Sequence, residues 1–271
     1  MKFKKICIVT VLALTLTSCA KSPTGRSTIK LFSSEQMNNM GEQAFTSLKE
    51  EQKTQAPELQ NAYVSCVAEH IVSQVPKSTF AGEWEVVVFD DDQINAFALP
   101  GGKIGVYTGL LKVAENQHQL AAVIGHEVGH VIAEHGNERM SQNTLVGIGM
   151  EVTSGVLENK SVGYSKELMS AIGLGVQVGF TLPFSRTHES EADLIGLDLM
   201  AKAGFNPAQS VKLWENMDKA SGGERPLEFL STHPAPTTRI DQLEKNMTNA
   251  NVLYRMSATK PKCTPEDSQR Q

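Results

Sequence analysis

Two histidines four residues apart, His126 and His130, constrain the fold of this chain more than any other feature. The apolar residues around them recur at helical spacing, which predicts one helix over residues 119–135. On a helix, side chains four residues apart lie about 40° apart around the axis, one turn above the other. Two imidazoles in this arrangement can bind one metal ion, so we expect the rest of the chain to be organised around this helix.

Glu127 completes the pattern His-Glu-x-x-His, which is typical of zinc hydrolases. Its carboxylate lies on the flank of the same helix face, where it can reach water at the metal without being a ligand. Gly129 is expected to leave space beside the metal, although glycine costs about 1 kcal/mol in a helix interior. The alternative is coincidence, since seven histidines in 271 residues would produce the pattern in roughly one such chain per hundred. Supporting elements elsewhere decide between the two.

Length and composition predict one globular domain with a core large enough to be stable alone, since the chain has 271 residues of which 40% are hydrophobic and 20% charged. The first 18 residues carry three lysines and no acid, so their removal would take the formal net charge from −5 to about −8. A negative charge of this size speaks against non-specific nucleic-acid binding, and we expect no nucleic-acid partner.

The N-terminal sequence is typical of an exported lipoprotein. Residues 1–5 are basic and residues 6–16 are apolar, a stretch too short to cross a bilayer. The tetrapeptide LTSC, which ends at Cys19, resembles a bacterial lipobox, where cleavage precedes the cysteine and the cysteine is lipidated. The residue after Cys19 is Ala20. An aspartate there would resemble an inner-membrane retention signal, so the alanine favours the outer membrane. The alternative is an ordinary signal peptide with an incidental cysteine.

Helices are expected at residues 34–48, 59–75, 109–115, 186–202, 207–220 and 236–246, and a capping box at Ser33 and Gln36 should begin the first. Residues 94–99 and 103–107 flank a Pro-Gly-Gly turn and predict a β-hairpin. Residues 145–182 are small and apolar, and we interpret them as close-packed buried helices rather than a membrane span, although residues 168–185 carry no charge.

A catalytic zinc ion keeps three protein ligands and one open position. His135 lies nine residues after His126, about 180° around the predicted helix, so it is not expected to join the pair. The third ligand is therefore expected on a second helix, and the acidic segment RTHESEAD at residues 186–193 offers three candidates.

The pattern His-Glu-x-x-His followed by Arg-x-x-Glu-x-x-Ala-Asp resembles the zinc metallopeptidases (gluzincins) of the HtpX and Ste-type CAAX prenyl protease family. The lipobox and the short length resemble the lipoprotein branch of that family, of the LoiP and YcaL kind. The resemblance covers roughly residues 37–246. It implies an α+β, predominantly α-helical, zincin-like fold with a small β-sheet or hairpin and an HExxH active-site helix.

The resemblance also implies one Zn²⁺ per chain and a catalytic site. Carried over residue by residue, the members are the ligands His126, His130 and Glu189, the general base Glu127, the supporting Asp193, and the oxyanion-binding His233 and Arg239. Asp193 would orient a ligand histidine. For His233, a surface or helix-capping role is the alternative.

Helical phase selects among the acids of residues 186–193. Glu189 and Asp193 are four apart and share a face, whereas Glu191 lies about 200° from Glu189. We therefore expect Glu191 to point away from the metal and its replacement by alanine to have little effect. The alternative is that the whole acidic run is a solvated helix face paired with Arg186.

Together these features predict a lipid-anchored periplasmic endopeptidase for quality control of unfolded or misassembled envelope proteins. Four segments are expected: a signal peptide (1–18), a lipidated tether (19–34), a zinc metallopeptidase domain (35–250) and a tail (251–271). The partners would be polypeptides, which could add as a strand along residues 94–99, and the membrane. A disulfide between Cys66 and Cys263 is expected. The alternative is that Cys66 is a free cysteine in the core. The alternative function is a chaperone or assembly-factor lipoprotein with a structural zinc, and the oligomeric state stays open.

Overall fold

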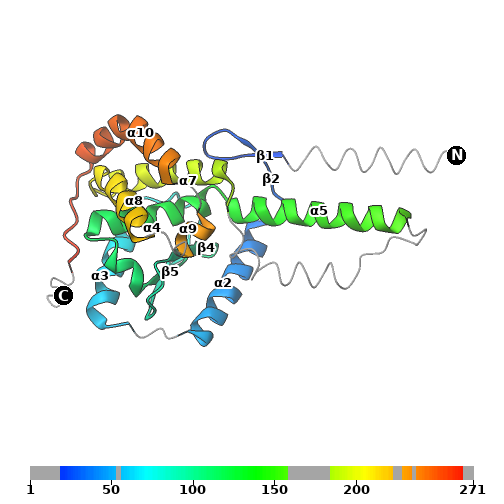
Figure 1. Cartoon of the computed structure of the whole chain (residues 1–271), viewed down its shortest axis with the longest axis horizontal. Helices are drawn as coiled ribbons and strands as arrows, with labels where there is room; N and C mark the ends of the chain where they lie inside the picture. The colour runs from blue at the N-terminus through cyan, green and yellow to red at the C-terminus, as the bar shows by residue number, and fades with distance from the viewer. Residues whose placement is uncertain (1–18, 53–55, 158–183, 222–227, 234–235, 265–271) are drawn as a thin grey trace.

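The computed structural model describes residues 19–52, 56–157, 184–221, 228–233 and 236–264. The predicted signal peptide and residues 168–183 of the uncharged segment lie outside them. The described part is predominantly helical with two small sheets, which confirms the predicted fold class (Figure 1). Its elements are β1 (Cys19–Lys21), β2 (Ser27–Ile29), α2 (Ser34–Glu51), α3 (Glu58–Val72), β3 (Glu85–Phe89), β4 (Ala96–Leu99), β5 (Lys103–Tyr107), η2 (Thr108–Lys112), α4 (Gln117–Ile132), α5 (His135–Leu157), α7 (Arg186–Lys202), α8 (Ala208–Ala220), α9 (Glu228–Thr232) and α10 (Pro236–Met256).

The larger sheet has the strand order β3-β5-β4, with β3 parallel and β4 antiparallel to β5. The predicted hairpin is confirmed. Its turn contains Gly101 at φ 83° and Gly102 at φ 70°, in the left-handed region that glycine adopts without steric cost. Within the described sheet, β4 is an edge strand, so its outer backbone groups are not paired with another strand of that sheet.

Helix α4 is buried along most of its length and occupies the centre of the fold (Figure 1). It begins at Asn116, whose side chain accepts hydrogen bonds from the backbone amides of His118 and Gln119. It ends at Ile132, so the predicted single helix over residues 119–135 was wrong at its C-terminal end. Glu134 breaks the helix with φ 55°, a conformation that costs a non-glycine residue roughly 1–2 kcal/mol, and α5 begins at His135.

Helices α4 and α7 approach each other closely through glycines. A Cβ atom on Gly129 would lie 2.8 Å from the carbonyl oxygen of Ala192, and one on Gly125 would lie 2.9 Å from that of Gly196. The prediction that Gly129 leaves space beside the metal was therefore wrong, because the backbone of α7 occupies that space. This close contact brings the residues of α7 within reach of those on α4.

The main hydrophobic core lies between α4 and its neighbours α3, α7, α8, α10 and the sheet. A smaller cluster under α2 contains Phe45, Phe89, Leu99 and Tyr107, and the predicted capping box at the start of α2 is confirmed. Helix α10 extends to Met256, past the domain end predicted at residue 250. The chain then returns to α3, where Cys66 and Cys263 form a disulfide with their Cα atoms 5.8 Å apart.

Helix α5 extends away from the body of the fold, with the β1–β2 hairpin beside its first turns (Figure 1). Leu145 is 44% and Val146 60% exposed, so the prediction of buried close-packed helices was wrong for the described start of that segment. Among the helices of the described residues, none is both long and apolar enough to cross a membrane.

Candidate metal centre

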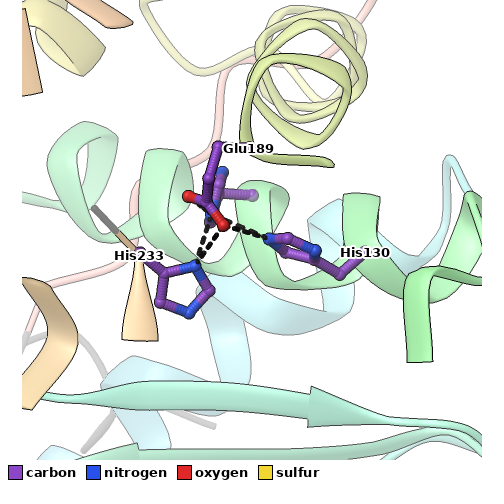
Figure 2. A group of neighbouring side chains, drawn as sticks. His130, Glu189 and His233 are labelled. Atoms are coloured by element: carbon purple, nitrogen blue, oxygen red, sulfur yellow. Dashed lines mark hydrogen bonds and ion pairs between the residues drawn. The ribbon is translucent and has the colours of Figure 1, made fainter. Parts of the chain in front are cut away.

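Four side chains, from two helices and from the residue that follows α9, converge at one buried point. Helix α4 contributes His126 and His130, α7 contributes Glu189, and α9 ends beside His233. Figure 2 shows His130, Glu189 and His233 pointing toward one another. One ligand atom from each of the four residues lies within 4.8 Å of all the others. The helical spacing in α4 and the close packing of α4 on α7 together produce this arrangement.

The distances between these atoms fit one zinc ion. Nε2 of His126 and Nε2 of His130 are 3.1 Å apart, and the Glu189 carboxylate oxygens lie 3.4 Å from His130 Nε2 and 3.5 Å from His126 Nε2. Zinc bonds of about 2.0–2.1 Å in a tetrahedron would separate neighbouring ligand atoms by about 3.3–3.4 Å. Two imidazoles and a carboxylate are a donor set that zinc prefers. The residues present therefore fit the one Zn²⁺ per chain expected from the sequence.

His233 lies among the ligand atoms rather than on the opposite side of the reaction centre. Its Nδ1 is 3.0 Å from Glu189 Oε1 and 3.3 Å from His126 Nε2. Its ring stacks on Phe229, with centroids 4.5 Å apart. In this geometry His233 supplies a fourth ligand atom, whereas the resemblance implied that it binds the oxyanion.

Asp193 and Arg239 support the ligands from behind. Asp193 Oδ1 lies 3.0 Å from His126 Nδ1, the ring nitrogen that faces away from the other ligand atoms. Arg239 donates through Nε and Nη2 to the two oxygens of Asp193 at 2.7 and 2.6 Å, and its Nη1 is 2.9 Å from Glu189 Oε2. Burial acts to raise the pKa of Asp193, but the Arg239 guanidinium and the His126 ring lower that pKa overall. Arg239 also lies over the ring of Trp214 at 3.7 Å.

Glu127 occupies the flank of the site, as expected for a general base. Its Oε1 is buried, and no described residue donates a hydrogen bond to this atom. Nε2 of His233 lies 3.6 Å from this oxygen. Burial raises the pKa of Glu127 to about 7, in the range where a carboxylate exchanges protons with water most effectively at neutral pH. The orphaned oxygen indicates a place for water or substrate.

A cleft of about 580 Å³ lies beside these residues. Glu127, His130 and His233 line it on one side, and residues 95–100, which contain the edge strand β4, line it on another. The N-terminal hairpin contributes Lys21 to the same cleft. The cleft therefore connects the metal centre with the edge strand β4.

Two buried residues beside the centre were assigned no role from the sequence. His135 Nδ1 lies 2.9 Å from His130 Nδ1, and Glu191 Oε2 lies 3.1 Å from His135 Nε2. Glu191 does point away from the metal, but its side chain is only 3% exposed and contacts His135 and Arg26, so we now expect its replacement to disturb these buried contacts. The available signal was the end of the apolar spacing after Ile132, which marks a helix break that changes the phase of His135.

Comparison with known proteins gives one consistent family. The model described as Peptidase family M48 matches residues 58–247. Mitochondrial metalloendopeptidase OMA1 of Schizosaccharomyces pombe is 38% identical over 191 residues, which cover 70% of this chain and 54% of that protein. OMA1 of Homo sapiens is 31% identical over 254 residues, covering 90% and 48%. The beta-barrel assembly-enhancing protease of Escherichia coli is 29% identical over 185 residues, covering 66% and 37%. The chain spans about half the length, or less, of these curated relatives.

Proposed function

Because the chain belongs to peptidase family M48 and is a zinc metallopeptidase, we propose that it is a lipid-anchored endopeptidase of the bacterial periplasm that cleaves unfolded or misassembled envelope proteins. The observation that carries the proposal is the shared cleft of the metal centre and the edge strand β4. The finer likeness to the LoiP and YcaL lipoproteins belongs to the proposal too, because it rests on the lipobox and the short length.

The chemistry follows from the residues at the centre. His126, His130 and Glu189 would hold the zinc ion, which when bound acts as a Lewis acid that activates water and polarises a carbonyl group. Glu127 takes the proton of the attacking water and passes it to the leaving amine. Arg239 holds the carboxylates of Asp193 and Glu189 in place. The contact of Arg239 and His233 with an oxyanion stays a prediction.

The edge strand supports a preference for unfolded substrates. A peptide that adds to β4 has to be extended, with its backbone amides and carbonyls available for hydrogen bonds. Segments inside folded domains do not meet this condition, because their backbone groups are already paired. The name of the Escherichia coli relative, which refers to β-barrel assembly, also favours envelope proteins as substrates.

A matched pair of substrates tests this preference. A small disulfide-bonded protein in its native form is expected to be cleaved more than about a thousandfold more slowly than the same protein reduced and alkylated, because native domains are stable by about 5–15 kcal/mol. Gel-based cleavage rates at equal concentration measure the ratio. Equal rates on both forms would contradict recognition of extended segments.

Export and lipidation at Cys19 predict where the protein is found. Replacing Cys19 with alanine is expected to move the protein from the membrane fraction to the soluble periplasm or to leave the precursor uncleaved, because each buried methylene of an acyl chain contributes about 0.8 kcal/mol to membrane binding. Cell fractionation with immunoblotting measures this. Cys7→Ala, in the predicted leader, is the matched control and should change nothing. A Cys19→Ala protein that is processed and still membrane-bound would contradict the lipid anchor.

A second function is favoured by the position of His233. Zinc sites with four protein ligands are usually structural, and His233 supplies a fourth ligand atom here. The chain would then be a chaperone or assembly factor that binds unfolded envelope proteins. Glu127 separates the two functions, because a structural zinc ion needs no general base beside it.

A further inference from the structure

A chain of hydrogen bonds leads from a metal ligand to the N-terminal hairpin. Nε2 of His130 faces the other ligand atoms, so it has to carry the lone pair and Nδ1 has to carry the hydrogen. His130 Nδ1 therefore donates to His135 Nδ1, 2.9 Å away. The same reasoning makes His135 Nε2 the donor to Glu191 Oε2 at 3.1 Å. Each tautomer in the chain is thus determined by the one before it.

The hairpin residues Thr24 and Arg26 hold Glu191 at the far end of this chain. The Thr24 hydroxyl donates to Glu191 Oε1 at 2.6 Å, and the Arg26 guanidinium donates through Nε and Nη2 to Glu191 Oε2 at 3.2 and 3.0 Å. Arg26 also makes a two-pronged ion pair with the buried Glu138, with both distances 2.7 Å. One guanidinium therefore fixes two buried carboxylates, one on α5 and one on α7.

A stacked ring reinforces the position of His135. The His188 ring lies nearly parallel to that of His135, with centroids 4.4 Å apart. His188 Nε2 is 3.2 Å from Glu138 Oε2, so Arg26 acts on His135 through both carboxylates. His135 itself is completely buried. The two carboxylates that hold His135 and the His188 ring in place, Glu191 and Glu138, are thus both paired with Arg26.

The backbone after the hairpin is attached to the same region. Asn137 accepts a hydrogen bond from the Phe32 amide and donates to the Phe32 carbonyl oxygen. The amide of Leu31 donates to the Ser141 hydroxyl at 2.8 Å, and Lys30 pairs with Glu134 at the break between α4 and α5. The segment interpreted from the sequence as a tether thus lies along the first turns of α5, next to the residues that orient His130.

We infer that the N-terminal hairpin is part of the metal centre: Arg26 and Thr24 orient His130 through Glu191 and His135. Metal-binding histidines depend on the partner of their second ring nitrogen, and losing such a partner typically weakens metal affinity or activity about 10–100-fold. His126 has a direct carboxylate partner in Asp193, whereas His130 reaches its carboxylate only through His135. Arg26, Glu191 and His135 are therefore positioning residues. This inference rests on the zinc site and is independent of the substrate and the membrane address.

Zinc affinity of the metal-free full chain, measured by competition with a chromophoric chelator, tests the inference without using activity. Arg26→Ala and Glu191→Gln are each expected to weaken zinc binding about 10–100-fold. Arg26→Lys should fall between wild type and Arg26→Ala, since an ammonium group cannot bridge both carboxylates with the same geometry. Ser27→Ala is the matched control in the hairpin, because its exposed hydroxyl contacts Lys21 across the turn rather than Glu191. It should bind zinc as the wild type does.

Two further variants separate orientation from general stability. His135→Asn keeps an acceptor near His130 Nδ1 and should retain more affinity than His135→Phe, which removes it. The visible spectrum of the cobalt-substituted protein should change in His135→Phe, because the geometry of His130 changes. Where Arg26→Ala fails to fold, Thr24→Val removes one bond to Glu191 at nearly constant volume and should still weaken zinc binding. Folded Arg26→Ala and Glu191→Gln proteins with affinities within about twofold of wild type would overturn the inference.

Discussion

Replacing Glu127 with glutamine is expected to slow peptide hydrolysis by about 10²–10⁴-fold, the usual contribution of a positioned general base. The zinc content should stay near one ion per chain, because Glu127 is not among the four residues whose ligand atoms converge. Glutamine has nearly the same volume as glutamate, so the packing of α4 should not change. The expected result is therefore a folded, zinc-loaded and nearly inactive protein.

The measurement combines the rate at which Glu127→Gln cleaves a reduced and alkylated substrate protein with metal analysis of the same enzyme sample. Glu69→Gln, on the exposed side of α3, is a matched control for loss of one carboxylate and should keep full activity. Undiminished cleavage by Glu127→Gln would contradict the peptidase mechanism. If Glu127→Gln instead loses its zinc, the separation of base and ligands described for this site is wrong.

Replacing Glu189 with alanine is expected to remove zinc and activity together. Glu189 supplies a carboxylate between the two histidines of α4, and its loss removes the one charged ligand among the four converging residues. The affinity for zinc should fall by more than the roughly 10–100-fold typical of residues that only support a ligand. Arg239 also loses the partner of its Nη1, and breaking a buried ion pair costs about 3–5 kcal/mol.

Because this cost could unfold the protein, Glu189→Gln is measured beside Glu189→Ala. The amide keeps the volume and should still bind zinc poorly, since it carries no charge. Asp198→Ala, on the same helix but beside Lys202, provides the matched control and should retain zinc and activity. Metal analysis after dialysis and circular dichroism are the two readouts. A folded Glu189→Gln protein with full zinc content would exclude Glu189 as a ligand.

The helical phase of α4 and α7 could be predicted from the sequence because it depends only on local spacing. His126, Glu127 and His130 follow from 3.6 residues per turn, and the same rule places Glu189 and Asp193 on one face. The β4–β5 hairpin follows from a Pro-Gly-Gly turn between two β-rich runs. These are local properties, and the structure agrees with them.

The role of His135 could not be predicted in this way. Its assignment assumed that α4 continues through residue 135, whereas Glu134 adopts a positive φ and starts a new helix. The apolar spacing ends after Ile132, but the local sequence does not specify the positive φ of Glu134. That conformation is strained for glutamate and is accompanied by the ion pair with Lys30, 104 residues earlier. The regular helical spacing of α4 therefore ends at Ile132, three residues before His135.

The sequence by itself determined which residues can bind zinc and activate water, because donor chemistry and helical spacing are local. Only the tertiary structure decided what lies behind those residues. Gly129 faces the backbone of α7, His233 joins the ligand atoms, and Glu191 faces the hairpin rather than solvent. Each depends on contacts between segments far apart in the chain, such as Arg26 with Glu191. Local spacing cannot encode such contacts, because the same spacing of polar residues on a helix is compatible with exposure to water and with contact to other buried polar groups.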